Sequence, residues 1–437
     1  MVVSRMVDYA QYGEMKPSRE KWLGEIPTSW KVLRLKRIFS IKKDIAGEEG
    51  HTVLSVTQKG IRPKAMSEKG QFAQDYSKYQ LVNHGDFVMN HMDLLTGWVD
   101  VSQYDGVTSP DYRVFINNKP DQFDSGYYRY IFQLCYSVRI FYGLGQGVAG
   151  FGRWRLPSDM FLNFVLPVPS ISEQHAIAAY LDDQIAQIDS IITEALASIE
   201  EYKQWKACIV FEAVTRGINS REEFRSTGNP WIDTLPHGIR LSRLGLHFDI
   251  TLGKMLCPNQ LDSSYTLEPY YCAANVHFSG VDESDLKEMW FSVDEKEKYR
   301  VMNGDLLVVE GGAGAGGCSI ARPLQTTYVQ NSIMIVRPRR KSDVRYVKYL
   351  LEMLVKRGYI DFVCNRATIP HFTKEKLSNV PFPVFPDNEI IEICNHVDEW
   401  YTRIDEMIET KTQLILDLEA YKRSLIYETV TGKRKVV

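Results

Sequence analysis

The chain has 437 residues, 44% of them hydrophobic and 24% charged, which is ordinary for a globular protein of two or more domains. Its formal net charge of −3 excludes a strongly basic protein that coats DNA alone, while local basic loops stay possible. The seven cysteines include no C-x-x-C pair, so neither a zinc ribbon nor a disulfide framework is indicated, and free thiols favour a reducing cytosol. The N-terminus lacks the apolar core of a signal peptide, and no apolar run is long enough to span a membrane.

The chain opens with residues 1–20, which are expected to form a loose leader. The next segment, Trp22–Ile41, matches a later one, Trp231–Ile250, at an offset of 209 residues. Identical residues at equivalent positions include the tryptophan, the proline and the phenylalanine of each segment. Each half of the chain therefore opens with the same tryptophan–proline turn.

After its opening segment, each half is predicted to form short strands separated by turns. The candidate strands are Thr52–Val56, Asp86–Asn90, Trp98–Val101 and Tyr112–Ile116 in the first half, and Leu306–Glu310, Cys318–Ala321 and Ser332–Val336 in the second. Helical patches are expected at Gly126–Tyr142 and Val344–Phe362. Proline-rich stretches, Leu166–Ser170 and Pro381–Pro386, are expected to stop a strand and let a helix begin.

Each half ends in a long predicted helix, Glu173–Gly217 in the first and Glu389–Gly432 in the second, related by an offset of 216 residues. Neither segment contains an internal proline or glycine, and each could reach roughly 65 Å at about 1.5 Å per residue. Apolar residues recur at alternating steps of four and three, which is typical of a coiled-coil seam, with Lys411 as a polar interruption. The predicted seam consists of Ile185, Ile188, Ile192, Ile199, Tyr401, Ile404, Ile408 and Ile415.

These repeats predict an α+β protein with two mixed, strand-rich domains separated by two long helices. We expect the helices to pack as an antiparallel coiled coil and the halves to be related by a pseudo-twofold axis, because a seam needs a partner and the duplication supplies one. Two unrelated surface helices on separate cores are the alternative. The predicted boundaries are 1–170 for the first domain, 171–217 for the first spacer helix, 218–386 for the second domain and 387–437 for the second spacer helix.

Several motifs that suggest catalysis do not fit their surroundings. Gly312–Gly317 matches G-x-G-x-x-G, but the residues that follow favour strands instead of the helix that a dinucleotide site requires, so a hairpin tip is predicted. Ser109–Tyr112 resembles the catalytic motif of amino-methyltransferases, with a mismatch at its third residue. The sequence has no P-loop, no histidines at metal-ligand spacing and no Ser-His-Asp arrangement, so we expect neither a catalytic residue nor a metal site.

Two polar clusters lie at equivalent places just before the long helices and are candidates for DNA contact. Arginine can bind guanine edges, amides can bind adenine, and lysine binds phosphate. The candidates for base contact are Gln146, Arg153, Arg155, Arg366, Thr368 and His371. Phosphate contact is assigned to Lys374 and to a basic segment expected to be a turn, with Lys59, Arg62 and Lys64. Solvated surface loops are the alternative for each single residue.

Three segments together carry a family resemblance: the opening MKPSREKWLGEIPTSWKVLRL, the closure LPVPSISEQHAIAAYLDDQIAQID, and the helix end FEAVTRG, which returns as YETVTG. The chain resembles the DNA-specificity (S) subunits of type I restriction–modification systems. The family's Glu-Gln after a proline-rich segment is met at Glu173-Gln174, while the second copy has Glu389-Ile390.

The resemblance implies a non-catalytic, cytoplasmic subunit from a bacterium or archaeon, with two target-recognition domains that each read half of a bipartite DNA sequence. It implies that two methylation subunits dock on the helices, and that restriction/translocase subunits join them. No cofactor is expected in this chain, since S-adenosylmethionine, ATP and magnesium would be bound by those partners. The alternatives are a standalone or fused adenine methyltransferase, which the missing motifs disfavour, and a two-domain adaptor that does not bind DNA.

Overall fold

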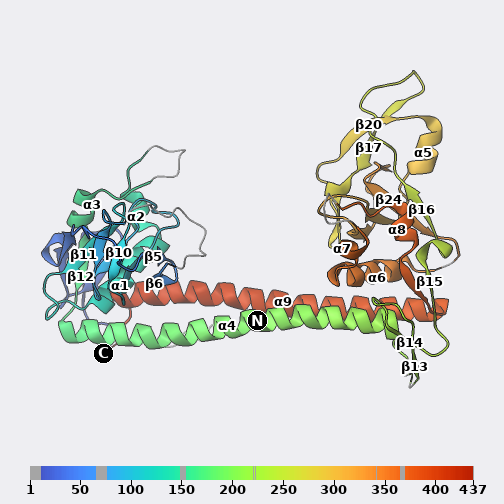
Figure 1. The fold of residues 1–437 in the computed structure, drawn as a ribbon. Coiled ribbons are helices and arrows are strands. Elements are labelled where there is room, and N and C mark those ends of the chain that lie inside the picture. The colour runs from blue at the N-terminus through green and yellow to red at the C-terminus, as the bar shows by residue number, and fades with distance from the viewer. Residues whose placement is uncertain are drawn as a thin grey trace. The chain divides into compact units, whose positions relative to one another are not determined.

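The structure is a computed structural model that describes residues 11–64, 76–147, 154–219, 221, 223–340, 342–364 and 370–436. It divides into two compact units (Figure 1). The first comprises Met1–Ala195 and Thr412–Val437, and the second comprises Leu196–Lys411. The two long helices, α4 (Ile171–Arg216) and α9 (Asp387–Val430), each contribute to both units.

The first unit is built on an antiparallel sheet with strand order β4-β11-β8-β9. Its core is aromatic: Phe39, Phe87, Phe115 and Phe132 are fully or almost fully buried, with mutual ring-centroid distances of 4.9 to 5.7 Å. The elements before α4 are β1 (Met15–Pro17), β2 (Glu25–Pro27), β3 (Lys31–Arg34), η1 (Leu35–Arg37), β4 (Phe39–Lys42), β5 (Leu54–Thr57), β6 (Gly60–Pro63), β7 (Gln80–Val82), β8 (Phe87–Met89), β9 (Val99–Val101), β10 (Gly106–Thr108), β11 (Arg113–Asn117), α1 (Ser125–Ser137), α2 (Ile140–Gly143), α3 (Ser158–Asn163) and β12 (Val165–Val168).

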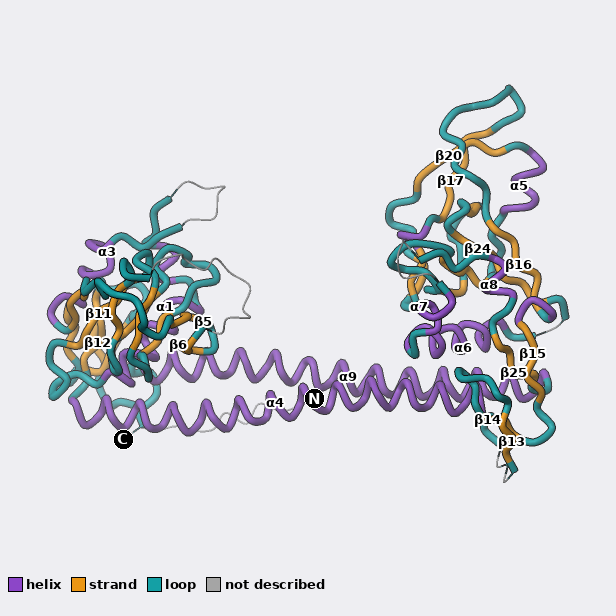
Figure 2. The backbone as a smooth tube through the Cα atoms, viewed as in Figure 1, coloured by secondary structure: helices purple, strands orange, loops and turns teal. Residues whose placement is uncertain are grey.

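The second unit repeats this plan, with strand order β16-β24-β21-β22 in its main sheet. The paired strands β16 and β24 lie side by side in Figure 2. Its elements between the long helices are β13 (Phe224–Ser226), β14 (Thr234–Pro236), β15 (Arg240–Arg243), η2 (Leu244–Leu246), β16 (Phe248–Leu252), β17 (Thr266–Tyr271), η3 (Ala273–Asn275), β18 (Val276–His277), β19 (Gly280–Val281), β20 (Lys287–Phe291), α5 (Val293–Tyr299), β21 (Leu306–Val309), β22 (Cys318–Ile320), β23 (Tyr328–Val329), β24 (Ile333–Pro338), α6 (Val344–Lys356), α7 (Tyr359–Val363), α8 (Lys374–Ser378) and β25 (Pro381–Val384).

All seven predicted strands are present, shifted by at most two residues at their ends, and both helical patches form helices. The proline-rich stretches differ from the prediction because they are strands themselves. β12 pairs antiparallel with β3, and β25 pairs with β15, each in a two-stranded sheet. Proline is tolerated there because a strand at a sheet edge does not need every amide as a donor.

The leader is also more ordered than expected where the structure describes it. β1 pairs with β2, and the Tyr12 hydroxyl donates a 2.5 Å hydrogen bond to Glu173 in the first turn of α4. The equivalent residue of the second unit is Arg221, which binds Glu389 in the first turn of α9. A residue that precedes each opening segment therefore binds the start of the next long helix.

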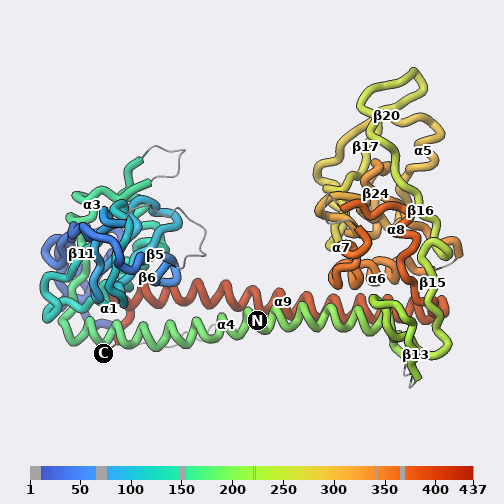
Figure 3. Tube along the Cα trace, in the orientation of Figure 1, coloured from blue at the N-terminus to red at the C-terminus, as the bar shows by residue number. Residues whose placement is uncertain are grey.

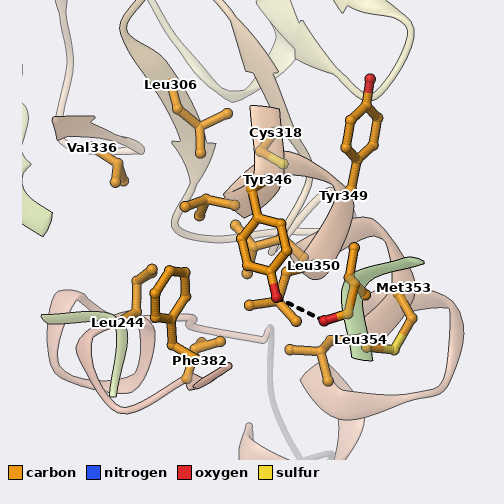
Figure 4. Close-up of a cluster of buried hydrophobic side chains, with 14 of the residues drawn as sticks. Leu244, Leu306, Cys318, Val336, Tyr346, Tyr349, Leu350, Met353, Leu354 and Phe382 are labelled. Carbon is orange, nitrogen blue, oxygen red and sulfur yellow. Dashed lines mark hydrogen bonds between the residues drawn. The ribbon is translucent and has the colours of Figure 1, made fainter. Parts of the chain in front are cut away.

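Within each unit, a tyrosine of the globular part binds the end of a long helix. The Tyr127 hydroxyl of α1 donates to the Val430 carbonyl of α9 at 2.9 Å in the first unit. The Tyr346 hydroxyl of α6 donates to the Val214 carbonyl of α4 at 2.7 Å in the second (Figure 4). Both tyrosines are fully buried, so these bonds replace water for groups that would be costly to leave unpaired.

The segments of α4 and α9 that share a unit run antiparallel (Figure 3). In the first unit, Lys422 Nζ lies 2.6 Å from Asp189 Oδ1. In the second unit, Lys206 Nζ lies 2.7 Å from Asp405 Oδ1. Lys206 and Lys422 are repeat equivalents, as are Asp189 and Asp405, so the same ion pair forms once in each unit.

The predicted seam positions are the less exposed ones along both helices. Ile188, Ile199 and Ile404 are buried, and the other predicted seam residues are half-buried. Trp205 and Trp400 also contact each other across the pair, with ring centroids 5.0 Å apart. We propose that these residues form the coiled-coil seam within each unit, and the pseudo-twofold axis stays a prediction.

Candidate nucleic-acid interface

The first predicted cluster is closed at its base by a two-residue bridge. The backbone amide of Gln146 donates to the Arg155 carbonyl at 2.9 Å, and the backbone amide of Arg155 donates to the Gln146 carbonyl at 3.1 Å. Trp154 fixes the loop from inside, because its Nε1 donates to the Tyr142 carbonyl at 2.7 Å. The structure therefore brings Gln146 and Arg155 together on an anchored loop, whereas Arg153 lies outside the described residues.

The second cluster is anchored differently. His371 is exposed and bridges to Gly311, and its carbonyl accepts a 2.6 Å hydrogen bond from Lys376 Nζ. Lys374 is exposed at the start of α8, where Thr373 caps the helix through the Lys376 amide. Arg366 and Thr368 lie outside the described residues, so their assignment stays a prediction.

A turn of the main sheet packs against each cluster, which the sequence did not indicate. In the first unit the β8–β9 turn reaches the loop through the Leu94 amide, 3.2 Å from the Trp154 carbonyl. In the second unit the β21–β22 turn does so through the Gly312 amide, 3.2 Å from the Pro370 carbonyl. The glycine motif is thus a hairpin turn, as predicted, but it also belongs to the candidate interface. Its backbone needs glycine, since Gly312 and Gly316 have φ values of +86° and +82°.

The two candidate interfaces differ in charge at equivalent positions. In the first unit, burial and the nearby Arg113 and Arg155 lower the pKa of His91 to about 4, so this ring is neutral at pH 7 among cations. In the second unit the position of His91 is taken by Glu310, whose Oε2 lies 3.3 Å from Nδ1 of His371. The first site offers donors and positive charge, while the second combines a carboxylate with an imidazole.

The basic segment around Lys59 belongs to the hairpin of β5 and β6. Lys59 lies in the turn between β5 and β6, but Arg62 belongs to strand β6 and not to a turn, because β5 and β6 pair as a hairpin. Lys64 follows that strand, and its amide donates to the Val53 carbonyl at 2.8 Å. Lys59 lines a hollow of about 860 Å³ together with residues of α1, α4 and α9 of the first unit.

In the described ranges, no group of three or more His, Cys, Asp or Glu side chains is placed to hold a metal ion. No helix among the described residues is long and apolar enough to cross a membrane.

Residues 27–201 match the family model described as the type I restriction modification DNA specificity domain. The specificity subunit of the type I restriction enzyme MjaVIII from Methanocaldococcus jannaschii is 22% identical over 454 residues, covering 99% of both chains. This chain therefore contains a type I restriction–modification DNA specificity domain. Its role is DNA target recognition, and it is a non-catalytic member of a type I complex.

Two solved structures share the fold of this specificity subunit. A chain from a structure concerned with complex assembly and conformational transition of the type I R-M system has a TM-score of 0.69 at 14% identity, covering 93% of this chain and 98% of that one. The HsdS subunit from Thermoanaerobacter tengcongensis has a TM-score of 0.55 at 15% identity, with the same coverage. The expected α+β fold, with strand-rich domains and long helices, is thereby confirmed.

Proposed function

We propose that this specificity subunit reads a bipartite DNA target, with each unit reading one half. The observation that carries the proposal is the repeated fold with unlike residues at one repeated place. Gln146, Arg155 and His91 in the first unit correspond to a site with His371 and Glu310 in the second. A shared scaffold with different donors and acceptors is what two modules that read different bases require.

We further propose that the long helices carry the methylation subunits, to which the restriction/translocase subunits are added in the bacterial or archaeal cytoplasm. The support is a set of large apolar side chains that remain exposed on these helices: Ile191, Leu196, Trp205, Leu414, Leu416 and Tyr421, with exposed fractions of 38 to 54%. S-adenosylmethionine, ATP and magnesium would then be bound by those partner subunits. Methyl transfer by the purified chain alone would contradict this division of labour.

Exchange of one domain tests the modular reading. Replacing residues 1–170 by the equivalent segment of a relative is expected to change one half of the methylated sequence and leave the other intact. The reason is that the site residues of the first unit all lie within the exchanged segment. Methylome sequencing of cells that carry the chimera measures both halves at once, and a change in both halves or in neither would reject the proposal.

Arg155 is expected to contact bases and not only the DNA backbone. Arg155→Ala should weaken binding by about 1–3 kcal/mol and relax specificity in one half-site only, since a base contact is lost on one unit. Lys64→Ala is the contrasting variant, expected to weaken binding to all sequences and to reduce its salt dependence. Binding of the complex with methylation subunits to a panel of variant sites distinguishes the two patterns. A uniform loss from Arg155→Ala would remove Arg155 from base reading.

A further inference from the structure

The first unit contains a buried arginine without a carboxylate partner. Arg113, at the start of β11, is 4% exposed, and its Nη2 donates to the Leu156 carbonyl at 2.9 Å and to Ser158 Oγ at 3.2 Å. Its guanidinium lies over the Phe161 ring, 4.6 Å from the centroid. Nη1 is buried with no hydrogen-bond partner among the described residues. One donor of a buried cation is therefore left for another group.

Arg113 lines a hollow of about 320 Å³ that has the chemistry of an anion site. The other polar residues around it are Lys43, Gln80, His91, Tyr112 and Ser158. His91 contributes a second buried atom without a partner in the described chain, Nδ1. No carboxylate lines the hollow, whereas Lys43 is exposed at it and forms no ion pair within the described residues.

The positive charge of Arg113 is costly to bury, and the fold does not require it. Burial lowers the pKa of Arg113 to about 10, which still leaves the guanidinium charged at pH 7. In the second unit the equivalent position holds Met334, fully buried in that unit's core. The equivalence follows from register, because Arg113 pairs with Met89 and Met334 pairs with Val308 at the same place of β8 and β21. The equivalent position of the second sheet therefore accepts an apolar side chain, so the fold of the sheet alone does not explain an arginine at position 113.

We propose that this hollow binds a phosphate of the DNA backbone in the half-site read by the first unit, with Arg113 Nη1 as its central donor and Lys43 and Ser158 beside it. The proposal rests on the DNA-reading function proposed above. A phosphate fits better than a guanine edge for two reasons. Guanine recognition needs two free nitrogens of the guanidinium, and Nη2 is already occupied twice. A recessed donor is also more accessible to a protruding phosphate than to a base edge inside the duplex.

The alternative role for Arg113 is to anchor residues 156–158 through its two Nη2 bonds. That role predicts lower stability for a variant, but it does not predict a change at one particular phosphate. The test must therefore find the phosphate, and DNA in which single phosphates are replaced by neutral methylphosphonates provides the probe.

Arg113→Met is the matched variant, because methionine occupies the equivalent place in the second unit. With wild-type protein in the complex with methylation subunits, one methylphosphonate in the first half-site should weaken binding roughly tenfold or more. With Arg113→Met, that substitution should have no further effect, and the salt slope should fall by about one. Thermal melting of both proteins reports folding, and Lys43→Ala, at an exposed residue, replaces Arg113→Met if the latter does not fold; it should reduce the same penalty.

Equal methylphosphonate penalties in the variant and the wild type at every position would overturn the phosphate site and leave Arg113 as an anchor. This outcome differs from failure of the proposed function, in which wild-type protein itself would show no preference among sequences. A loss confined to one base pair, with no phosphate effect, would also overturn it in favour of base reading.

Discussion

Ile404→Asp is expected to lower the free energy of unfolding of the second unit by roughly 4 kcal/mol or more. Ile404 is fully buried on α9, one residue from Asp405, which binds Lys206 of α4. The substitution removes apolar burial and places a carboxylate where the repeat predicts the helix seam. Hydrogen exchange along residues 400–410, measured on the full chain, should rise steeply.

Leu196→Asp is the matched control, since it makes a similar chemical change at a position that is 52% exposed on α4 in the same unit. It should change the exchange little. Ile188→Asp is the repeat equivalent in the first unit, where Ile188 is 5% exposed, and should act there as Ile404→Asp does in the second. If Ile404→Asp is no worse than Leu196→Asp, the seam assignment is wrong.

The long helices and most strands could be predicted because their signals are local and occur twice. Two copies of an apolar pattern at constant offset are a strong indication, and the strands carry the alternation and turns that short strands need. The strands at Val165–Val168 and Pro381–Val384 could not be predicted because their prolines argue against a strand, and only pairing with β3 and β15 overrides that preference.

The family motif Glu173-Gln174 illustrates what sequence alone leaves unexplained. Gln174 is fully buried, and its side chain accepts from the Asp124 amide at 2.8 Å and donates to the Pro169 carbonyl at 3.0 Å. The motif therefore joins the start of α4 to the start of α1. In the second copy a buried Ile390 takes this place, so the departure from the pattern removes hydrogen bonds without exposing the site.

The sequence indicates only part of the candidate site. The loop that holds Gln146 and Arg155 has a compositional signal, and the structure shows the loop closed by the bridge between them. Arg113 had no such signal, because it reads as one residue of an ordinary strand until its burial and missing partner are known. A buried charged side chain such as Arg113 can be identified only from the three-dimensional structure.

Glu389→Ala should cost about 2–4 kcal/mol of stability in the second unit, a little below the usual range for breaking a buried ion pair because Arg221 is partly exposed. Glu389 is 3% exposed, and its two oxygens lie 2.7 and 2.6 Å from Nη1 and Nη2 of Arg221, a bidentate pair. Its removal leaves the guanidinium beside Phe385 without its carboxylate.

The equivalent change in the first unit provides the scale. Glu173→Ala removes a hydrogen bond that the uncharged hydroxyl of Tyr12 donates to the carboxylate, so we expect a smaller loss of about 1.5 kcal/mol. Urea denaturation of both variants and of Glu389→Ala/Arg221→Ala measures the difference, and the double variant should recover part of the loss because no unpaired charge remains. Equal losses from Glu173→Ala and Glu389→Ala would mean that the ion pair adds nothing beyond a hydrogen bond from an uncharged donor. A larger loss from Glu389→Ala would show that the equivalent glutamates of the two copies act with different partners. In the second copy, the ion pair with Arg221 would then stabilise the start of α9.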